Sequence, residues 1–143
     1  MTLTQLTVKL KNEPGELSKI SDILGDDGIN IRAVNASVHG KDARVHMVVD
    51  DTERAEEAMK SHGYETRKYE VVAVETPDHP GGLNAFLRPL KEEGINVEFL
   101  YPMIGRLKGN AVMVLGADPM PKAIKALERY YINIIGPEKV AAL

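Results

Sequence analysis

The chain has 143 residues, of which 43% are hydrophobic and 27% are charged, a balance typical of a folded, water-soluble protein. Its formal net charge of −3 argues against nucleic acid as the main partner. The sequence contains no cysteine, which excludes disulfides, thiolate catalysis and thiolate metal sites. The N-terminal residues do not resemble a signal peptide, and no stretch reaches the ~18 apolar residues that a membrane helix needs. We therefore expect a cytoplasmic protein without a membrane partner.

The first module of the chain has a strand, a turn and a helix in succession. Apolar residues alternate with polar ones over residues 6–10, which predicts a strand with one buried face. A turn at residues 11–15 follows, in which Pro14 suits a loop that enters a helix. Leu17, Ile20, Ile23 and Leu24 recur at helical spacing, and Gly28 is expected to end this helix.

The rest of the first module continues with two strands, a helix and a strand. The β-rich segment 29–38 changes phase, so we predict a bulge near Ala33. A hairpin turn at residues 40–42 and a strand at 45–49 follow. The next element is a helix that Asp50, Asp51 or Thr52 can cap; it buries Ala55, Ala58 and Met59 and ends at Gly63. A further strand begins at Tyr64.

A repeat organises the chain. Pro14 recurs as Pro80, 66 positions later (80 − 14 = 66), and Gly28 recurs as Gly94 at the same offset. The second copy begins with Val72 and Val74. A helix lined by Leu83, Phe86, Leu87 and Leu90 follows, and then strands at residues 95–100 and 111–115. The last two elements are a helix after Pro119 and Pro121 that carries Ile124 and Leu127, and a closing strand at 131–135.

The predicted fold class is α+β, with two tandem ferredoxin-like βαββαβ modules and antiparallel sheets. We place the modules at residues 1–68 and 69–143. The segment from Tyr64 to Glu75 is short for two strands and a turn. The last strand of the first module is therefore expected to run almost directly into the first strand of the second.

The duplicated motif resembles that of the ACT domain family, small regulatory modules that bind amino acids. The residues that carry this resemblance are Asn12, Pro14, Gly15, Leu17, Gly28, Asn30 and Ile31, then Asp78, Pro80, Gly81, Leu83, Gly94, Asn96 and Val97. The resemblance covers nearly the whole chain. It implies a ligand between the first loop and helix start of one module and a neighbouring module, usually across a dimer or domain interface.

The chemistry of these loops suits an amino acid. The start of a helix offers free N–H groups to a carboxylate, a glycine lets the backbone approach a ligand, and an asparagine amide both donates and accepts. The same residues also fit purely structural roles in turns and helix starts. The predicted ligand-binding residues are Asn12, Glu13, Pro14, Gly15, Glu16, Leu17, Asn30, Ile31, Asp78, His79, Gly81, Gly82, Leu83, Asn96 and Val97.

No catalytic residue, cofactor or metal site is predicted. The histidines show no metal-ligand spacing, and no phosphate-binding or nucleophile motif is present. We expect a regulatory protein that senses an amino acid, forms a homodimer, and acts on an enzyme or a transcription factor. A structural module without a ligand is the alternative. An enzyme with a ferredoxin-like fold is less favoured, because Glu13 and Asp78 would repel phosphate. An RNA-binding sheet is also less favoured, because it would need aromatic residues on its middle strands.

Overall fold

The computed structural model describes residues 2–143. The chain divides into two compact units. The N-terminal unit is Thr4–Tyr69, and the C-terminal unit joins the residues up to Leu3 with Glu70–Leu143. Each unit has the βαββαβ order and the antiparallel sheet that the sequence predicts.

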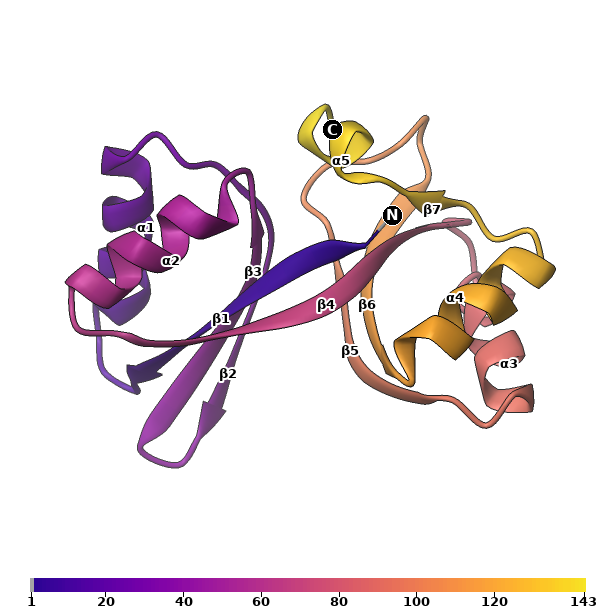
Figure 1. The fold of residues 1–143 in the computed structure, drawn as a ribbon, viewed down its shortest axis with the longest axis horizontal. Coiled ribbons are helices and arrows are strands. Elements are labelled where there is room, and N and C mark those ends of the chain that lie inside the picture. Colours follow the sequence, from indigo (N-terminus) through magenta and orange to yellow (C-terminus); the bar gives the residue numbers. More distant parts are fainter. Residues whose placement is uncertain (1) are drawn as a thin grey trace. The chain divides into compact units, whose positions relative to one another are not determined.

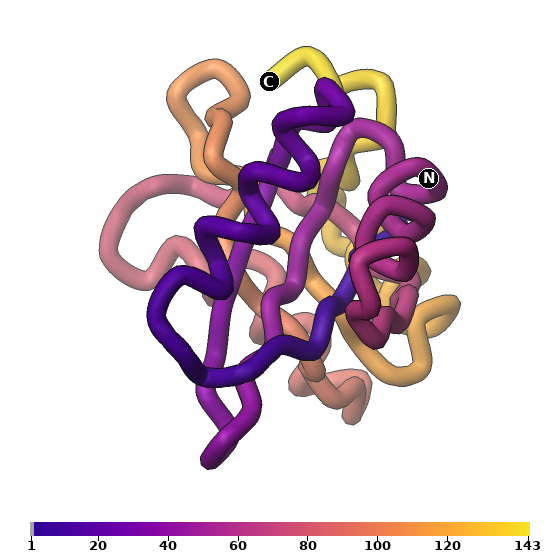
Figure 2. The backbone as a smooth tube through the Cα atoms, turned by 90° about the vertical axis from the view of Figure 1, so that its left-hand side faces the viewer, coloured from indigo at the N-terminus to yellow at the C-terminus, as the bar shows by residue number. Residues whose placement is uncertain are grey.

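The N-terminal unit is a four-stranded sheet covered on one face by two helices. Its elements are β1 (Leu3–Lys11), α1 (Glu16–Asp26), β2 (Ile31–His39), β3 (Asp42–Val49), α2 (Thr52–Ser61) and the first part of β4 (Glu65–Thr76). The strand order is β2-β3-β1-β4. Figures 1 and 2 show α1 and α2 side by side on the same face of these strands. The core between helices and sheet is aliphatic, with Leu6, Val45 and Met59 among its most buried members.

The C-terminal unit repeats this arrangement and adds a short helix. Its elements are the rest of β4, α3 (Asn84–Glu92), β5 (Asn96–Pro102), β6 (Ala111–Asp118), α4 (Met120–Arg129), β7 (Ile134–Ile135) and α5 (Pro137–Ala141). The order of its strands is β5-β6-β4-β7. Its core gathers around Phe86, Leu115 and Leu127, which are fully buried between the helices and the sheet.

Helix α1 ends as the sequence predicts. Gly28 follows the C-cap residue with a φ of 69°, and its N–H donates to Gly25. The next N–H, that of Ile29, reaches back to the carbonyl of Leu24. This pair of bonds is the Schellman motif, in which the left-handed conformation favours glycine.

The predicted bulge and the predicted continuous strand are both confirmed. The pairing of β2 with β3 shifts register between Ile31 and Ala33, and that of β5 with β6 shifts between Val97 and Phe99. The two bulges are again 66 positions apart (97 − 31 = 66). No turn interrupts β4, which runs unbroken from Glu65 to Thr76.

Three expectations about local structure are wrong. Tyr131 to Ile135 is not a strand throughout, because Tyr131 adopts a positive φ and only Ile134–Ile135 pairs with β4. Pro121 lies inside the first turn of α4, where the missing N–H costs no intrahelical bond. Leu17 leaves half of its surface exposed, because it lies in the first turn of α1, at the edge of the core.

Helix α5 has no counterpart among the sequence predictions. Pro137 occupies its first position, and it buries Val140. None of the helices formed by residues 2–143 has the length and apolar character needed to cross a membrane.

Candidate functional site

The loop between β1 and α1 forms one wall of a pocket of about 240 Å³, which we call the N-terminal pocket. The opposite wall comes from the β2–β3 hairpin. The pocket is lined by Leu10, Lys11, Asn12, Glu13, Gly15, Glu16, Leu17, Ser18, Ala36, Ser37, Val38, Ala43 and Arg44. Five of the predicted binding residues are therefore brought together here: Asn12, Glu13, Gly15, Glu16 and Leu17. Pro14 shapes the loop but does not line the pocket.

Gly15 sets the conformation of this loop. It is the N-cap residue of α1 and has a φ of 86°, in the left-handed region that favours glycine. A Cβ atom at this position would meet nothing within 4 Å. The requirement for glycine is therefore conformational rather than steric. No backbone carbonyl of residues 2–143 accepts from the amides of Gly15, Leu17 and Ser18, so these groups are open to an anion.

The charged side chains around the N-terminal pocket differ in their ion pairs and hydrogen bonds. The carboxylate of Glu16 accepts from the Tyr64 hydroxyl at 3.2 Å and lies 3.8 Å from the Lys19 ammonium. Burial, together with the hydrogen bond and negative charge of Glu16, raises the pKa of Tyr64. Lys11 and Arg44 line the pocket and form no ion pair with the described part of the chain. The pocket lining therefore carries charges of both signs, Lys11 and Arg44 beside Glu13 and Glu16.

Asn30 and Ile31 lie at the other end of β2 from this pocket. Ile31 begins the strand, whereas the pocket touches its last residues, from Ala36 onward. At a rise of about 3.3 Å per residue, five residues separate the two places by roughly 16 Å. The carbonyl of Asn30 accepts from the amide of Asp50, whose carboxylate binds Arg32 at 2.7 Å. Within one unit, therefore, Asn30 and Ile31 do not meet the loop.

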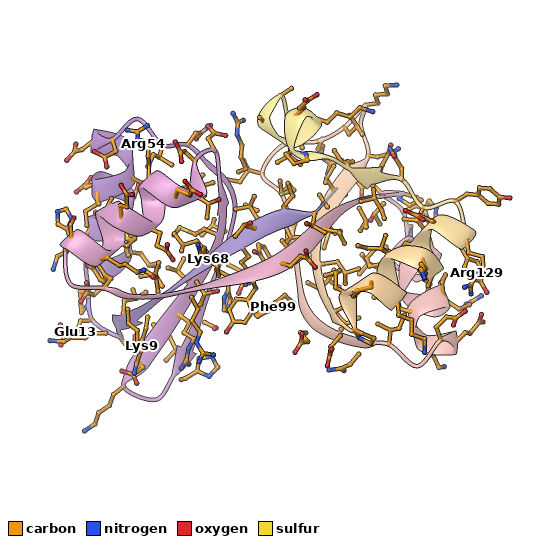
Figure 3. The ribbon with its side chains drawn as sticks, in the orientation of Figure 1. Lys9, Glu13, Arg54, Lys68, Phe99 and Arg129 are labelled. Atoms are coloured by element: carbon orange, nitrogen blue, oxygen red, sulfur yellow. The ribbon has the colours of Figure 1, made fainter. Side chains whose placement is uncertain are left out.

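Figure 3 shows this separation through two labelled side chains of the N-terminal unit. Glu13, in the pocket loop, and Arg54, at the start of α2, lie at opposite ends of the unit. Arg54 donates to the carbonyl of Asp27 at 2.7 Å, beside the turn that leads to Asn30. The predicted residues thus form two groups, one at each end of the unit.

The C-terminal unit has a pocket at the corresponding place, with a volume of about 610 Å³. We call it the C-terminal pocket. It is lined by Thr76, Pro77, Asp78, His79, Gly81, Gly82, Leu83, Asn84, Leu87, Pro102, Ala111 and Met113. The predicted residues Asp78, His79, Gly81, Gly82 and Leu83 are all among these. Asn96 and Val97 are not, because they begin β5 at the far end of that strand.

The two pocket loops differ at their glycines. Gly81 has a positive φ of 78°, like Gly15. Gly82 occupies the position of Glu16, and a Cβ there would lie 2.1 Å from the carbonyl oxygen of Pro77. Only glycine fits so close an approach. The C-terminal loop is therefore folded more tightly on itself than the N-terminal one.

The loop between β5 and β6, residues 103–110, is bonded to Asp78, which lines the C-terminal pocket, and to Glu75 on β4. Arg106 donates to Asp78 at 2.9 Å and to the carbonyl of Gly109 at 3.0 Å. Asn110 donates to Glu75 at 2.7 Å, and Asn133 donates to the other oxygen of the same carboxylate. The amides of Asn110 and Asn133 lower the pKa of Glu75 by stabilising its charged form.

Sequence reasoning missed Thr76, Arg106, Lys11 and Arg44. A signal for Thr76 was present, because at the offset of 66 it replaces Leu10 on the buried face of its strand (76 − 10 = 66). Arg106 had no such signal, since its role depends on how an irregular loop folds. In the sequence, α1 and β2 lie between Lys11 and Arg44, and only the sheet places these two residues at one pocket.

Two βαββαβ units, each with a pocket at the loop before its first helix, define the class as a pair of ferredoxin-like domains. The model of the ACT domain pair family matches residues 1–142, and the chain belongs to this family. No curated protein sequence is significantly similar to it.

Solved structures share the fold. A protein from Bacteroides thetaiotaomicron aligns with a TM-score of 0.91 and 24% identity, over 100% of this chain and 98% of that one. The ligand-free regulatory subunit of aspartate kinase from Thermus thermophilus aligns at 0.67 and 16% identity, over 90% and 93% of the two chains. The corresponding subunit from Thermus flavus aligns at 0.61 and 15%, over 92% and 94%.

Proposed function

We propose that this protein is a regulatory protein that binds an amino acid and transmits its presence to an enzyme or a transcription factor, without catalysing a reaction itself. The observation that carries the proposal is the duplicated pocket. In each unit the loop that contains the Pro-Gly pair lines a pocket at the start of a helix. Membership of the ACT domain pair family, whose domains are regulatory, supports this role.

In the N-terminal pocket we expect the ligand's carboxylate to accept from the open amides of Gly15, Leu17 and Ser18. Lys11 and Arg44 add positive charge on that side, and the exposed Glu13 is suited to the ammonium group. The pocket wall formed by Leu10, Ala36 and Val38 leaves room for a small apolar side chain. The ligand would thus be held by its zwitterionic end.

We further propose that a second copy of the chain completes this site through β2. This strand is at the edge of its sheet and has no further strand beside it within residues 2–143. Residues 33–38 of β2 carry no charge, and Val34 and Val38 are 43% and 60% exposed. Edge strands that stay unpaired are usually protected by charged residues, so this edge favours pairing between copies. In such a homodimer, Asn30 and Ile31 of one copy can approach the loop of the other.

The test is a thermal melting screen against each common amino acid, followed by calorimetry of any that stabilise the protein. A ligand at about 100 times its Kd raises the free energy of unfolding by about 2.7 kcal/mol. Asn30→Ala should weaken binding by about 1–2 kcal/mol, because a directed hydrogen bond is lost. Ser21→Ala, at an exposed position of α1 outside both the pocket lining and β2, is the control.

Two results would count against the proposal. If no amino acid binds at millimolar concentration, the alternative of a structural module without a ligand becomes the better account. If an amino acid binds but Asn30→Ala and Ser21→Ala leave its affinity equally unchanged, Asn30 is not part of the site. Sedimentation of a monomer at high concentration would contradict the homodimer.

A further inference from the structure

The C-terminal pocket contains a buried hydroxyl group that lacks a partner. Thr76 is 2% exposed and lines the pocket, and its Oγ1 has no hydrogen-bond partner among residues 2–143. It shares the helix-facing side of β4 with the core residues Val72 and Val74. A buried hydroxyl is normally satisfied, and the residue that carries this one lines a pocket that can hold a partner for it. At the same place in the N-terminal unit stands Leu10, which has no polar atom to satisfy.

A second feature lies beside this pocket. The Arg106 guanidinium and the Asp78 carboxylate form an ion pair of 2.9 Å, in which each side chain is 58% exposed. Ion pairs this exposed contribute little to stability, so opening this one is inexpensive. Asp78 itself lines the pocket, and Arg106 is held next to it by the carbonyl of Gly109. An amino acid's zwitterion carries the complementary charges, its ammonium for Asp78 and its carboxylate for Arg106.

We propose that the C-terminal pocket binds a free α-amino acid whose side chain carries one neutral hydrogen-bonding group, a hydroxyl or an amide. Asp78 and Arg106 exchange their mutual ion pair for contacts with the ammonium and the carboxylate, and Thr76 pairs with the polar atom of the side chain. The proposal rests on the amino-acid-binding function proposed above, and it assigns a role to Thr76 and Arg106 that the family motif does not.

The chemistry of the pocket disfavours other side chains. An aliphatic side chain would leave the Thr76 hydroxyl buried and unpaired. Such an unpaired group strongly lowers the affinity of an aliphatic ligand relative to its polar isostere. A charged side chain would be buried among Leu83, Leu87 and Met113, with no counter-ion among the lining residues beyond Asp78, which the ammonium occupies. His79 is exposed and faces the carbonyl of Pro80.

The experiment is calorimetry of the full chain with two isosteric pairs of ligands, L-threonine against L-valine and L-asparagine against L-leucine. We expect the polar member of a pair to bind at least about tenfold more tightly. Thr76→Val should abolish this preference, and it should not lower the melting temperature, because it removes an unsatisfied buried group. Asp78→Asn and Arg106→Gln should each weaken binding about tenfold or more, since each removes a charged contact.

Arg129→Gln is the matched control, because it breaks an ion pair with Glu93 in the same unit that is not part of the pocket lining. It should leave affinity unchanged. If an amino acid binds with an affinity that Thr76→Val, Asp78→Asn and Arg106→Gln do not alter, this assignment is overturned while the proposed function stands. If Thr76→Val leaves the preference for the polar member of each pair unchanged, the role of Thr76 is overturned. If nothing binds, both proposals fall.

Discussion

At the scale of single residues, glycines with positive φ mark the turns on which each unit depends. Gly15 and Gly81 lie in the pocket loops, and Gly63 follows the end of α2. The corresponding residue after α4 is Tyr131, which adopts a φ of 58° although it is not glycine. It makes the same backbone bonds as Gly63, and its side chain is 94% exposed. The ring therefore makes few packing contacts, and these do not offset the strain of the left-handed backbone.

Replacing this residue should stabilise the protein. Tyr131→Gly relieves the left-handed strain and loses few contacts, so we expect the free energy of unfolding to rise by about 0.5–1 kcal/mol. Urea denaturation measures the change. Gly63→Tyr, the reverse substitution at the matching position of α2, should destabilise the protein. A fall in stability for Tyr131→Gly would show that the exposed ring makes a contact that matters.

At the scale of elements, the helices differ in how they begin. The carboxylate of Asp51 accepts from the amide of Arg54 at 3.1 Å and so caps α2. No side chain of residues 2–143 caps the starts of α1, α3 or α4. The two helices that begin at the pockets, α1 and α3, are both in the uncapped group. Their starts are therefore less stabilised from within the chain than that of α2.

The contribution of the Asp51 cap to the free energy of unfolding can be measured by substitution. Asp51→Ala leaves the amide of Arg54 without its acceptor, which we expect to cost about 1 kcal/mol. Asp51→Asn retains an oxygen acceptor and should cost much less. Chemical denaturation followed by circular dichroism compares the two. Equal losses would mean that the negative charge near the helix start, rather than the hydrogen bond, carries the effect.

At the scale of the whole molecule, stability should depend on pH through His46. Its Nδ1 lies 2.9 Å from Oγ1 of Thr7, on the neighbouring strand. Burial lowers the pKa of His46, and the charges of Arg44 and His39 lower it further. The folded protein therefore binds fewer protons at this site than the unfolded chain does. Stability is then greatest above the unfolded pKa, which is about 6.5, and falls as the pH drops below it.

The pH dependence can be assigned by substitution. We expect urea midpoints to decline between pH 7.5 and pH 5.5, and His46→Gln to reduce the slope of that decline, because it removes the titrating group. His79→Gln, in the C-terminal unit, serves as the comparison. An unchanged slope in His46→Gln would assign the decline to other groups.

The repeat predicted the architecture from local patterns alone. Helical spacing of apolar residues, alternation in strands, and Gly28 and Gly94 after the first helices all depend on neighbours within a few positions. The phase change near Ala33 likewise predicted a bulge, and the short segment before Glu75 predicted an unbroken β4. These features follow from backbone geometry, which the order of residues expresses directly.

Other features depended on which distant segments meet. The family motif joins the Pro-Gly loop and Asn30, yet the sheet places them at opposite ends of β2, because β2 runs parallel to β1 and away from the turn after α1. Strand order alone brings the β2–β3 hairpin to the N-terminal pocket and Arg106, in the loop of residues 103–110, to Asp78 of the C-terminal pocket. The sequence by itself determined the repeat, most of the helices and strands, and the two Pro-Gly loops as candidate binding loops. The tertiary structure decided which side chains share a pocket, because strand pairing brings together residues that no local pattern connects.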